Sequence, residues 1–378
     1  MTEKTYSIEQ FPPRVDLQTV PVLQKLSQAR AALGEMKGRA TSLPNQAILL
    51  DTLFLQEALA SSEIENIVTT QDEVFRVDLV ADTGSVEAKE VARYRDAMRR
   101  GYEQWRKNRF ISENMLIDMF RLLKQRDEGY RRIPVAVRNM QTGEDIYMPP
   151  PNGRAIEMYM RDLANFINDP APEDMDPLVK MALIHHQFES IHPFSDGNGR
   201  VGRMLNVLYL THAGLLDTPI LYLSRAINRT KPDYYRLLQA VREQGAWEAW
   251  VIYILSAVHE TASLTLRLIS GIRDLMSEHK IRMRDELPKI YSQDLLNNLF
   301  RHPYTRIEYV ANDLDIRRQT ARKYLKQLTA HHFVNEIKSG RNNYYVNEQL
   351  VALFVNVSAE EKPAETESKS ATRTGASG

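Results

Sequence analysis

The chain has 378 residues, of which 43% are hydrophobic and 26% are charged, and its formal net charge is zero. This composition is that of an ordinary folded protein with room for two domains, and the zero net charge provides no overall field that would attract nucleic acid or a membrane surface. The chain has no cysteine, which excludes disulfides, thiolate metal sites and a cysteine nucleophile.

The N-terminal segment MTEKTYSIEQFPPRVD lacks the basic and apolar parts of a signal peptide. No stretch approaches the about 20 consecutive apolar residues that span a bilayer. We therefore expect a cytoplasmic protein with no membrane partner. Residues 1–20 contain prolines and no apolar periodicity, so they are predicted to form an extended lead-in.

Apolar residues recur at helical spacing through residues 22–66, and the sequence Leu-Pro-Asn at 43–45 divides this stretch into two predicted helices. Ser61 and Glu65, at the end of the second helix, are four residues apart and therefore share a helix face. Taken alone, this short pattern is as typical of a solvated helix end as of a functional motif.

Two further helices are predicted at 86–107 and 111–123, and then the pattern changes. Residues 131–138 and 144–148 are short β-like runs joined by a Gln-Thr-Gly turn at 141–143, which together predict a β-hairpin. A hairpin of this kind is by itself more often a plain structural turn than a functional element.

Helices are also predicted at 156–167 and from Pro177 onwards, where Asp176 is a good N-cap and proline suits the first helical position. His185 and His186 follow in this second helix, without a third ligand at metal-binding spacing. We expect these two histidines to lie in the core or to support the site behind it.

The stretch with the most chemistry is IHPFSDGNGR, residues 191–200, which continues as Val-Gly-Arg. Gly197 and Gly199 can adopt positive φ and allow backbone N–H groups to converge on an anion. An apolar-periodic run follows at once, so the loop opens a helix whose N-terminus adds unpaired N–H groups and the positive end of the helix dipole. This geometry favours a phosphate-binding loop.

The side chains of the same stretch suit a polyphosphate. Arg200 and Arg203 are three residues apart and can hold neighbouring phosphates from one helix face. Asp196 is a hard oxygen ligand for Mg²⁺ that is bound partly through phosphates. His192 has an ordinary pKa near neutrality and can accept a proton from an attacking hydroxyl. Any one of these residues alone is more typical of a turn between core helices.

Aromatic residues at helical spacing between residues 232 and 250 predict core packing, and residues 251–300 predict one or two connecting helices. From residue 301 the pattern resembles a winged helix-turn-helix, with helices at 306–312 and 318–328 and strands near 334–337 and 343–346. Residues 358–378 are rich in Glu, Lys, Ser, Thr and Ala, and we expect a disordered tail.

The second helix of this C-terminal pattern carries a basic face that is typical of a DNA reader. A solvated face of a protein-interaction or dimer module would have the same composition. The basic residues are Arg317, Arg318, Arg322, Lys323 and Lys326.

The string from His192 to Arg203 resembles, position for position, the signature of Fic-domain proteins: His-Pro-Phe, any residue, Asp or Glu, Gly-Asn-Gly-Arg, then a second Arg three residues later. The group Ser61, Glu65 and Asn66 resembles the inhibitory motif that lies upstream of the signature in many Fic proteins. The predicted hairpin lies where Fic proteins carry a flap that holds the target segment by strand pairing.

The resemblance implies transfer of AMP from ATP to a Ser, Thr or Tyr hydroxyl of a protein target, with release of pyrophosphate. His192 would deprotonate the hydroxyl, and Asp196 would hold Mg²⁺. The resemblance also implies a set of nucleotide-binding residues. These are Gly197, Asn198, Gly199, Arg200, Val201, Gly202, Arg203 and Tyr235.

The resemblance further implies autoinhibition. If Glu65 pairs with Arg203, that arginine is unavailable to the γ-phosphate, and ATP binds with its α-phosphorus misaligned for attack. Two other interpretations stay open: hydrolytic removal of AMP from a modified protein, with Glu65 positioning the water, and an ATP-sensing regulator that binds DNA. Self-modification and a homodimer are compatible with the family, whereas the protein target and the trigger that releases Glu65 are not encoded in any recognisable pattern.

We therefore expect a mainly α protein. Residues 21–270 would form a Fic-fold helical bundle with a small β-hairpin flap and the N-terminal inhibitory helix. Residues 271–300 would form connecting helices, and residues 301–357 a winged helix domain.

Overall fold

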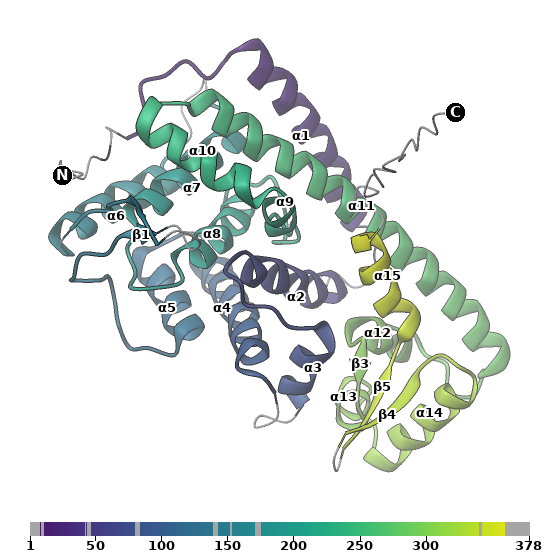
Figure 1. Ribbon diagram of the computed structural model, residues 1–378. Coiled ribbons are helices and arrows are strands. Elements are labelled where there is room, and N and C mark those ends of the chain that lie inside the picture. Colours follow the sequence, from purple (N-terminus) through teal and green to yellow (C-terminus); the bar gives the residue numbers. More distant parts are fainter. Residues whose placement is uncertain are drawn as a thin grey trace, which may run out of the picture.

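The computed structural model describes residues 8, 11–41, 43, 47–79, 84–138, 143–151, 153–170, 175–339 and 342–359. Figure 1 shows a mainly helical protein with two small antiparallel sheets, which confirms the predicted fold class. Residues 1–7, 9 and 10 of the predicted lead-in, the first two residues of the predicted hairpin turn and residues 360–378 of the predicted tail lie outside the described residues.

The N-terminal part comprises helices α1 (Val20–Ala40), α2 (Ala47–Ile64) and α3 (Gln71–Leu79). The break between α1 and α2 falls at the predicted Leu-Pro-Asn sequence, whereas α3 was not predicted. Helix α2 is apolar on most of its surface and packs against α4, α8, α9 and α12. It is therefore an internal helix, and Ser61 near its end is fully buried.

Five helices build the bundle around the predicted site, and their caps agree with the sequence. Ser85 and Ser112 cap the first two, and Asp176 accepts a hydrogen bond from the Leu178 N–H at 2.8 Å at the start of the fourth. The helices are α4 (Val86–Asn108), α5 (Glu113–Lys124), α6 (Gly153–Asn168), α7 (Pro177–Ile191) and α8 (Asn198–His212).

The predicted hairpin is present as strands β1 (Val137–Arg138) and β2 (Asp145–Tyr147), which pair antiparallel with Val137 opposite Tyr147. Both strands are shorter than the predicted runs. The reason is that Pro134 and the prolines from Pro149 onwards have no N–H to donate to a ladder. The hairpin is anchored on the bundle, because the Tyr147 hydroxyl donates to the Ser190 carbonyl at 2.9 Å.

After α9 (Ser224–Arg229) and α10 (Lys231–Gln244), the single helix α11 (Trp247–Glu286) runs for 40 residues. It crosses residue 270, where the sequence predicted the end of the Fic domain, because its apolar periodicity continues without a break. Among the described residues α11 is the one helix long and apolar enough to cross a membrane. It packs along α1, however, and 56% of that apolar window is buried inside the protein, as in a core helix.

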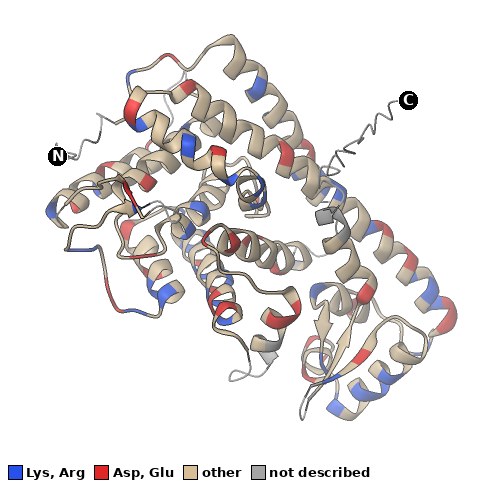
Figure 2. Ribbon diagram, viewed as in Figure 1, with Lys and Arg blue, Asp and Glu red and all other residues tan. Residues whose placement is uncertain are grey.

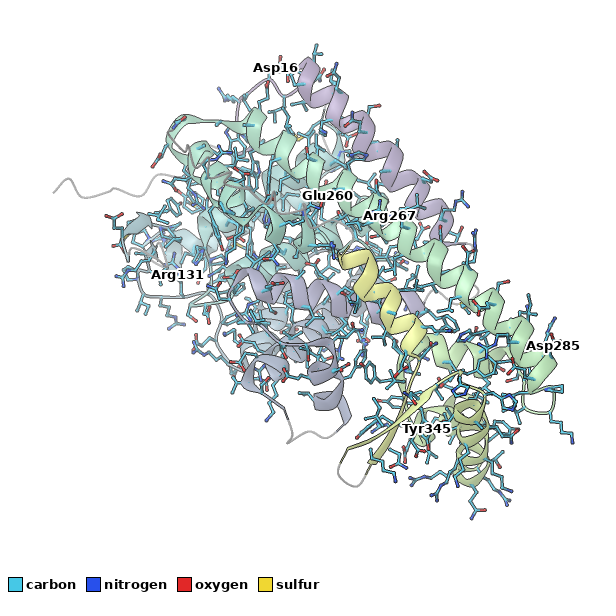
Figure 3. All side chains as sticks on the ribbon, turned by 45° about the vertical axis from the view of Figure 1, so that its right-hand side comes forward. Asp16, Arg131, Glu260, Arg267, Asp285 and Tyr345 are labelled. Atoms are coloured by element: carbon cyan, nitrogen blue, oxygen red, sulfur yellow. The ribbon has the colours of Figure 1, made fainter. Side chains whose placement is uncertain are left out.

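The C-terminal unit has the order helix, strand, helix, helix, strand, strand, and its sheet has the strand order β3-β5-β4. A last helix, which was not predicted, packs back against α11 and reaches beyond residue 358. Figure 3 shows this unit, marked by Tyr345, at the opposite end of the molecule from Arg131. The elements are α12 (Gln293–Arg301), β3 (Tyr304–Thr305), α13 (Ile307–Asp313), α14 (Arg318–Ala330), β4 (Asn335–Ser339), β5 (Asn342–Val346) and α15 (Glu348–Ala359).

Candidate active site

His192 is the residue that ends α7 and turns the chain into the glycine loop. Its backbone is left-handed, with φ 51° and ψ 59°, and its N–H donates to the Phe188 carbonyl at 3.0 Å. The buried Arg131 guanidinium donates to the His192 carbonyl at 2.8 Å and to the Pro150 carbonyl at 2.7 Å. One arginine therefore fixes the histidine and the base of the hairpin together.

The loop between α7 and α8 is braced from inside. The buried Asn198 side chain accepts from the Phe194 N–H at 2.8 Å and donates to the Phe194 carbonyl at 2.9 Å. The Phe194 ring stacks on Phe120 with centroids 4.3 Å apart, and Gly197 has φ 72°. The Asn198 side chain thus shapes the loop, so it is the backbone there that remains for an anion.

The first intrahelical bond of α8 runs from the Val201 N–H to the Gly197 carbonyl at 3.1 Å. The amides of residues 198–200 therefore have no acceptor within the helix, which is the usual state of a helix N-terminus and suits an anion. The Glu65 carboxylate lies beside them, because a Cβ added at Gly199 would stand 2.5 Å from Glu65 Oε1. A carboxylate thus lies at the mouth of the predicted phosphate loop.

The same carboxylate is paired with Arg203. Arg203 Nη2 donates to Glu65 Oε1 at 2.8 Å and to the Ser61 carbonyl at 2.9 Å, while its Nε donates to Ser61 Oγ at 2.8 Å. The Arg203 side chain is only 1% exposed. Burial alone would lower the pKa of this guanidinium, but the adjacent Glu65 raises it, so Arg203 stays charged.

The other signature arginine is also engaged. Arg200 Nη1 donates to Glu90 Oε1 at 2.6 Å, and Lys124 Nζ lies 2.9 Å from the same oxygen and 2.6 Å from Asp196 Oδ2. Burial raises the pKa of both carboxyls, but the hydrogen bonds and charges of Lys124 and Arg200 together outweigh it and hold each pKa below its ordinary value. Arg200, Glu90, Lys124 and Asp196 thus form one charged chain along the loop.

The imidazole of His192 is held neutral. Burial, with Arg242 and Arg131 nearby, lowers its pKa to about 4. A neutral imidazole has a lone pair to accept a proton, and a bound polyphosphate would raise its pKa again because negative charge favours the imidazolium. His185 and His186 are buried, the former bonded to the Tyr234 hydroxyl at 2.9 Å, so both are core residues as expected.

Tyr235 is 42% exposed and meets Tyr234 edge to face, with centroids 5.2 Å apart. Partial burial and then the Glu65 carboxylate raise the pKa of the Tyr235 hydroxyl, so this hydroxyl lies within electrostatic range of the inhibitory motif. Asn66 lies in the turn after α2 with φ 60° and accepts from Lys231 Nζ at 3.0 Å. Asparagine tolerates this left-handed backbone better than most residues, which accounts for its position after Glu65.

Glu189 is a site residue that the sequence did not reveal. Its side chain is 7% exposed, Oε1 has no hydrogen-bond partner in the described part of the chain, and a Cβ at Gly202 would lie 2.8 Å from that oxygen. Burial raises its pKa to about 7, although Arg203 opposes the shift. The local sequence contains no signal for it, since Glu189 lies within a helix that is otherwise core.

Glu90, Lys124, Arg131 and Arg242 were missed for a similar reason. Each comes from an element remote in sequence from residues 192–203, and a single charged residue on an amphipathic helix is ordinarily a solvated one. Only the packing of α4, α5, the hairpin base and α10 around the loop makes them part of the site.

Comparison with known proteins agrees with this geometry. Three family models match the chain in succession: "Fic/DOC family N-terminal" at residues 23–103, "Fic/DOC family" at 110–210, and "Protein adenylyltransferase SoFic-like, C-terminal domain" at 275–350. The chain belongs to the Fic/DOC family.

Curated relatives carry matching names. A probable protein adenylyltransferase of Aquifex aeolicus is 30% identical over 176 residues, which cover 44% of this chain and 51% of that protein. The protein adenylyltransferase fic-1 of Caenorhabditis briggsae is 31% identical over 107 residues, which cover 28% of this chain and 19% of that protein. The chain thus spans about half or less of the length of these relatives.

Solved structures support the fold. A Fic family protein from Desulfovibrio desulfuricans G20 has a TM-score of 0.53 and 23% identity, covering 89% of this chain and 98% of that one. A segment of Fic-1 from Caenorhabditis elegans has a TM-score of 0.50 and 18% identity, covering 67% of this chain and 73% of that one.

Proposed function

We propose that this protein is an autoinhibited protein adenylyltransferase that transfers AMP from ATP to a hydroxyl of a protein target. The names of its relatives support the reaction class. The observation that carries the proposal is the position of the Glu65 carboxylate, which lies beside Gly199 at the α8 N-terminus and is bonded to Arg203, where an anion would bind. A loop that accommodates a carboxylate in this way is built for phosphate.

In the proposed reaction the target hydroxyl oxygen attacks the α-phosphorus of ATP. His192 takes the hydroxyl proton, the bond from the α-phosphorus to the bridging oxygen breaks, and pyrophosphate leaves. Arg203 would neutralise the terminal phosphates once Glu65 has withdrawn. The short edge of β2 would align the target segment beside His192, since the Arg131 clamp fixes both.

The site also fits Mg²⁺. The described residues hold no cluster of three His, Cys, Asp or Glu that would bind a metal on their own. Asp196 is nevertheless 55% exposed, and Mg²⁺ is commonly bound by one or two carboxylates together with substrate phosphates. Bound there, Mg²⁺ would neutralise charge on the phosphates. Lys124, now 2.6 Å from Asp196, would have to give up this contact.

The test is transfer of α-labelled AMP from ATP with Mg²⁺, with self-modification as the readout. We expect slow labelling by wild type, labelling faster by about two orders of magnitude for Glu65→Gly, and none for His192→Ala. Glu63→Gly is the matched control, because Glu63 is exposed on the same helix end and should leave the rate unchanged.

Equal rates for wild type and Glu65→Gly would remove Glu65 from the mechanism. Absence of label in every variant, with ATP binding intact, would favour the hydrolytic reaction. Loss of AMP from a modified target that depends on Glu65 would then establish it.

We also propose that the C-terminal unit is a winged helix domain that binds DNA. Figure 2 shows Lys and Arg along α14, where Arg322, Lys323 and Lys326 are exposed. Arg318 is also exposed, but it pairs with Glu308 of α13. Duplex binding that weakens steeply with salt and is lost in Arg322→Gln/Lys326→Gln would support this, and no binding at low salt would contradict it.

A further inference from the structure

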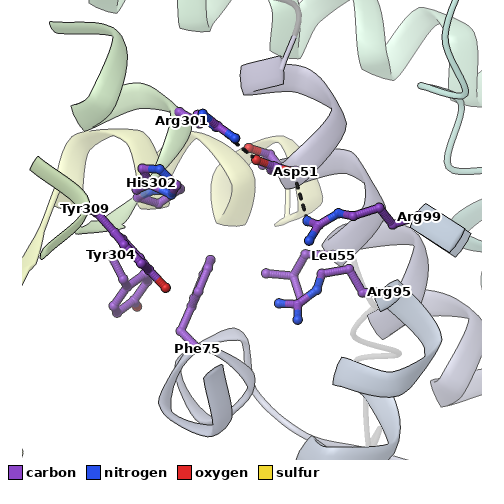
Figure 4. Close-up of a pocket in the computed structure, with 11 residues that line it drawn as sticks. Asp51, Leu55, Phe75, Arg95, Arg99, Arg301, His302, Tyr304 and Tyr309 are labelled. Atoms are coloured by element: carbon purple, nitrogen blue, oxygen red, sulfur yellow. Dashed lines mark hydrogen bonds and ion pairs between the residues drawn. The ribbon is translucent and has the colours of Figure 1, made fainter. Parts of the chain in front are cut away.

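A pocket of about 460 Å³ lies between the helices that precede the site and the C-terminal unit, and His192 does not line it. Residues from α2, α3 and α4 form one side of it, and residues from α12, β3 and α13 form the other. Figure 4 shows that its side chains fall into two groups, one charged and one aromatic. The volume is within the range of sites for small metabolites.

The charged wall is made of Arg95, Arg99, Arg301 and Asp51. Asp51 is shared, because its Oδ1 lies 2.9 Å from Arg99 Nη2 and its Oδ2 lies 3.3 Å from Arg301 Nε. Arg95 pairs at 2.9 Å with Asp96, which does not line the pocket. The lining residues thus include three arginines and one carboxylate, Asp51, which bridges Arg99 and Arg301.

The aromatic wall is made of Phe75, Tyr304, His302 and Tyr309. The Phe75 and Tyr304 rings stack with centroids 4.3 Å apart, although they belong to different units of the protein. Burial lowers the pKa of His302 although Asp313 opposes the shift, so this ring is neutral and adds an aromatic face rather than a charge. The wall suits a planar ring.

We propose that this pocket is a second ligand site, which takes a phosphorylated aromatic metabolite the size of a nucleoside monophosphate. The phosphate would lie between Arg99 and Arg301 in place of the Asp51 carboxylate, and two guanidinium groups match its oxygens in a way that one shared aspartate does not. The ring would lie against Phe75 and Tyr304.

The site is connected to Glu65 through α2. Asp51 lies in the first half of this helix, Ser61 lies in its last turn, and Glu65 follows directly after its end. The Asp51 pairs to Arg99 and Arg301 tie α2 to α4 and to the C-terminal unit. A ligand that takes over both arginines releases these ties, and the inhibitory end of α2 loosens. This link, unlike the binding itself, rests on the proposed function.

The test of binding is calorimetric titration of 5′-AMP at low salt into four proteins: wild type, Arg99→Gln/Arg301→Gln, Asp51→Asn and Arg100→Gln. The titration is repeated with Gly199→Ala added to each protein, because the new Cβ would stand 2.8 Å from Arg203 Nη1 and keep 5′-AMP out of the catalytic loop, so that differences report the pocket. Arg100 is exposed on α4 beside Arg99 and does not line the pocket, so it is the matched control.

We expect the double arginine variant to bind about tenfold or more weakly and Asp51→Asn to bind more tightly, since it removes the competing carboxylate. Arg100→Gln should bind like wild type. Adenosine without phosphate should bind about tenfold more weakly than 5′-AMP. Equal affinity in wild type and the double variant, weaker binding by Asp51→Asn, or equal binding of adenosine would each overturn the proposal.

The link to Glu65 is measured separately, by hydrogen–deuterium exchange of residues 58–66. Addition of 5′-AMP should speed the exchange of these amides in wild type. In Arg99→Gln/Arg301→Gln the exchange rates with and without 5′-AMP should be equal. Binding as expected without this change would overturn the link and leave the site in place. Neither measurement depends on AMP transfer, so a failed transfer assay would not affect them.

Discussion

Arg203 and Ser61 are joined by two hydrogen bonds, from Nε to Oγ at 2.8 Å and from Nη2 to the carbonyl at 2.9 Å. Both groups are buried, so the arginine is held in one orientation, with the rest of Nη2 directed at Glu65. The serine of the inhibitory motif thus positions the arginine that its glutamate occupies, which explains why the two are spaced four residues apart.

Ser61→Ala should therefore activate the enzyme in part. The variant loses the hydrogen bond from Arg203 to Ser61 Oγ but keeps the one to the carbonyl of residue 61. A single hydrogen bond to a charged group is worth about 1.5–3 kcal/mol, and most of this is recovered when Arg203 turns to water or phosphate. We expect an AMP-transfer rate several-fold above wild type and below Glu65→Gly. Ser62→Ala is the matched control, because the Ser62 hydroxyl is buried without a partner in the described part of the chain. Equal rates in the two alanine variants would contradict this.

Gly199→Ala should block nucleotide binding even after Glu65 is removed. The new Cβ would stand 2.8 Å from Arg203 Nη1, where the terminal phosphates are proposed to bind. In a Glu65→Gly background we expect about tenfold weaker ATP binding or more, because a methyl group covers the helix N-terminus. Gly38→Ala, with no atom within 4 Å of its added Cβ, is the control. Unchanged ATP affinity would show that phosphate binds elsewhere.

Lys124→Gln should alter the Mg²⁺ requirement. Lys124 competes for Asp196 at 2.6 Å, so its removal leaves that carboxylate available. In a Glu65→Gly background the Mg²⁺ concentration for half-maximal transfer should fall by about threefold or more, as expected when one charge competitor is lost. Lys107→Gln, at an exposed position in α4, is the control. A higher requirement would show that Lys124 supports the site instead.

Glu57→Gln should flatten the pH dependence of stability. Glu57 is buried, accepts from the Ser224 N–H at 3.1 Å and from Tyr94 at 3.2 Å, and burial raises its pKa from 4.5 to about 7. The native state then binds more protons than the unfolded state between these values, so the free energy of unfolding falls as pH rises, by about 3 kcal/mol at most.

At pH 8 the glutamine variant should accordingly be more stable than wild type by about 1–3 kcal/mol, and at pH 4.5 the advantage should vanish. Denaturant unfolding at both pH values measures this. Glu189, whose pKa is also raised to about 7, contributes equally to the pH dependence of the free energy of unfolding in both proteins. The exposed Glu103→Gln is the control, and parallel pH slopes for wild type and Glu57→Gln would refute the assignment.

The sequence by itself determined what is local. Helix positions followed from apolar periodicity and caps such as Asp176, and the glycine loop with His192 could be recognised because its residues are consecutive. The motif Ser61 to Asn66 could be recognised for the same reason. Properties that depend on residues within one turn or one helix produce a recognisable sequence pattern, so the fold class and the centre of the site were predictable.

Only the tertiary structure decided which charges meet. Glu65 and Arg203 are 138 positions apart, Glu90 and Arg200 are 110 apart, and Asp51 and Arg301 are 250 apart. Each partner alone is an ordinary charged residue on a helix, and its pairing depends on how helices remote in sequence pack. The resemblance supplied the first of these pairs as an expectation. The Glu90 bridge, the buried Glu189 and the pocket at Asp51 have no sequence signal, because burial and proximity exist only once the chain has folded.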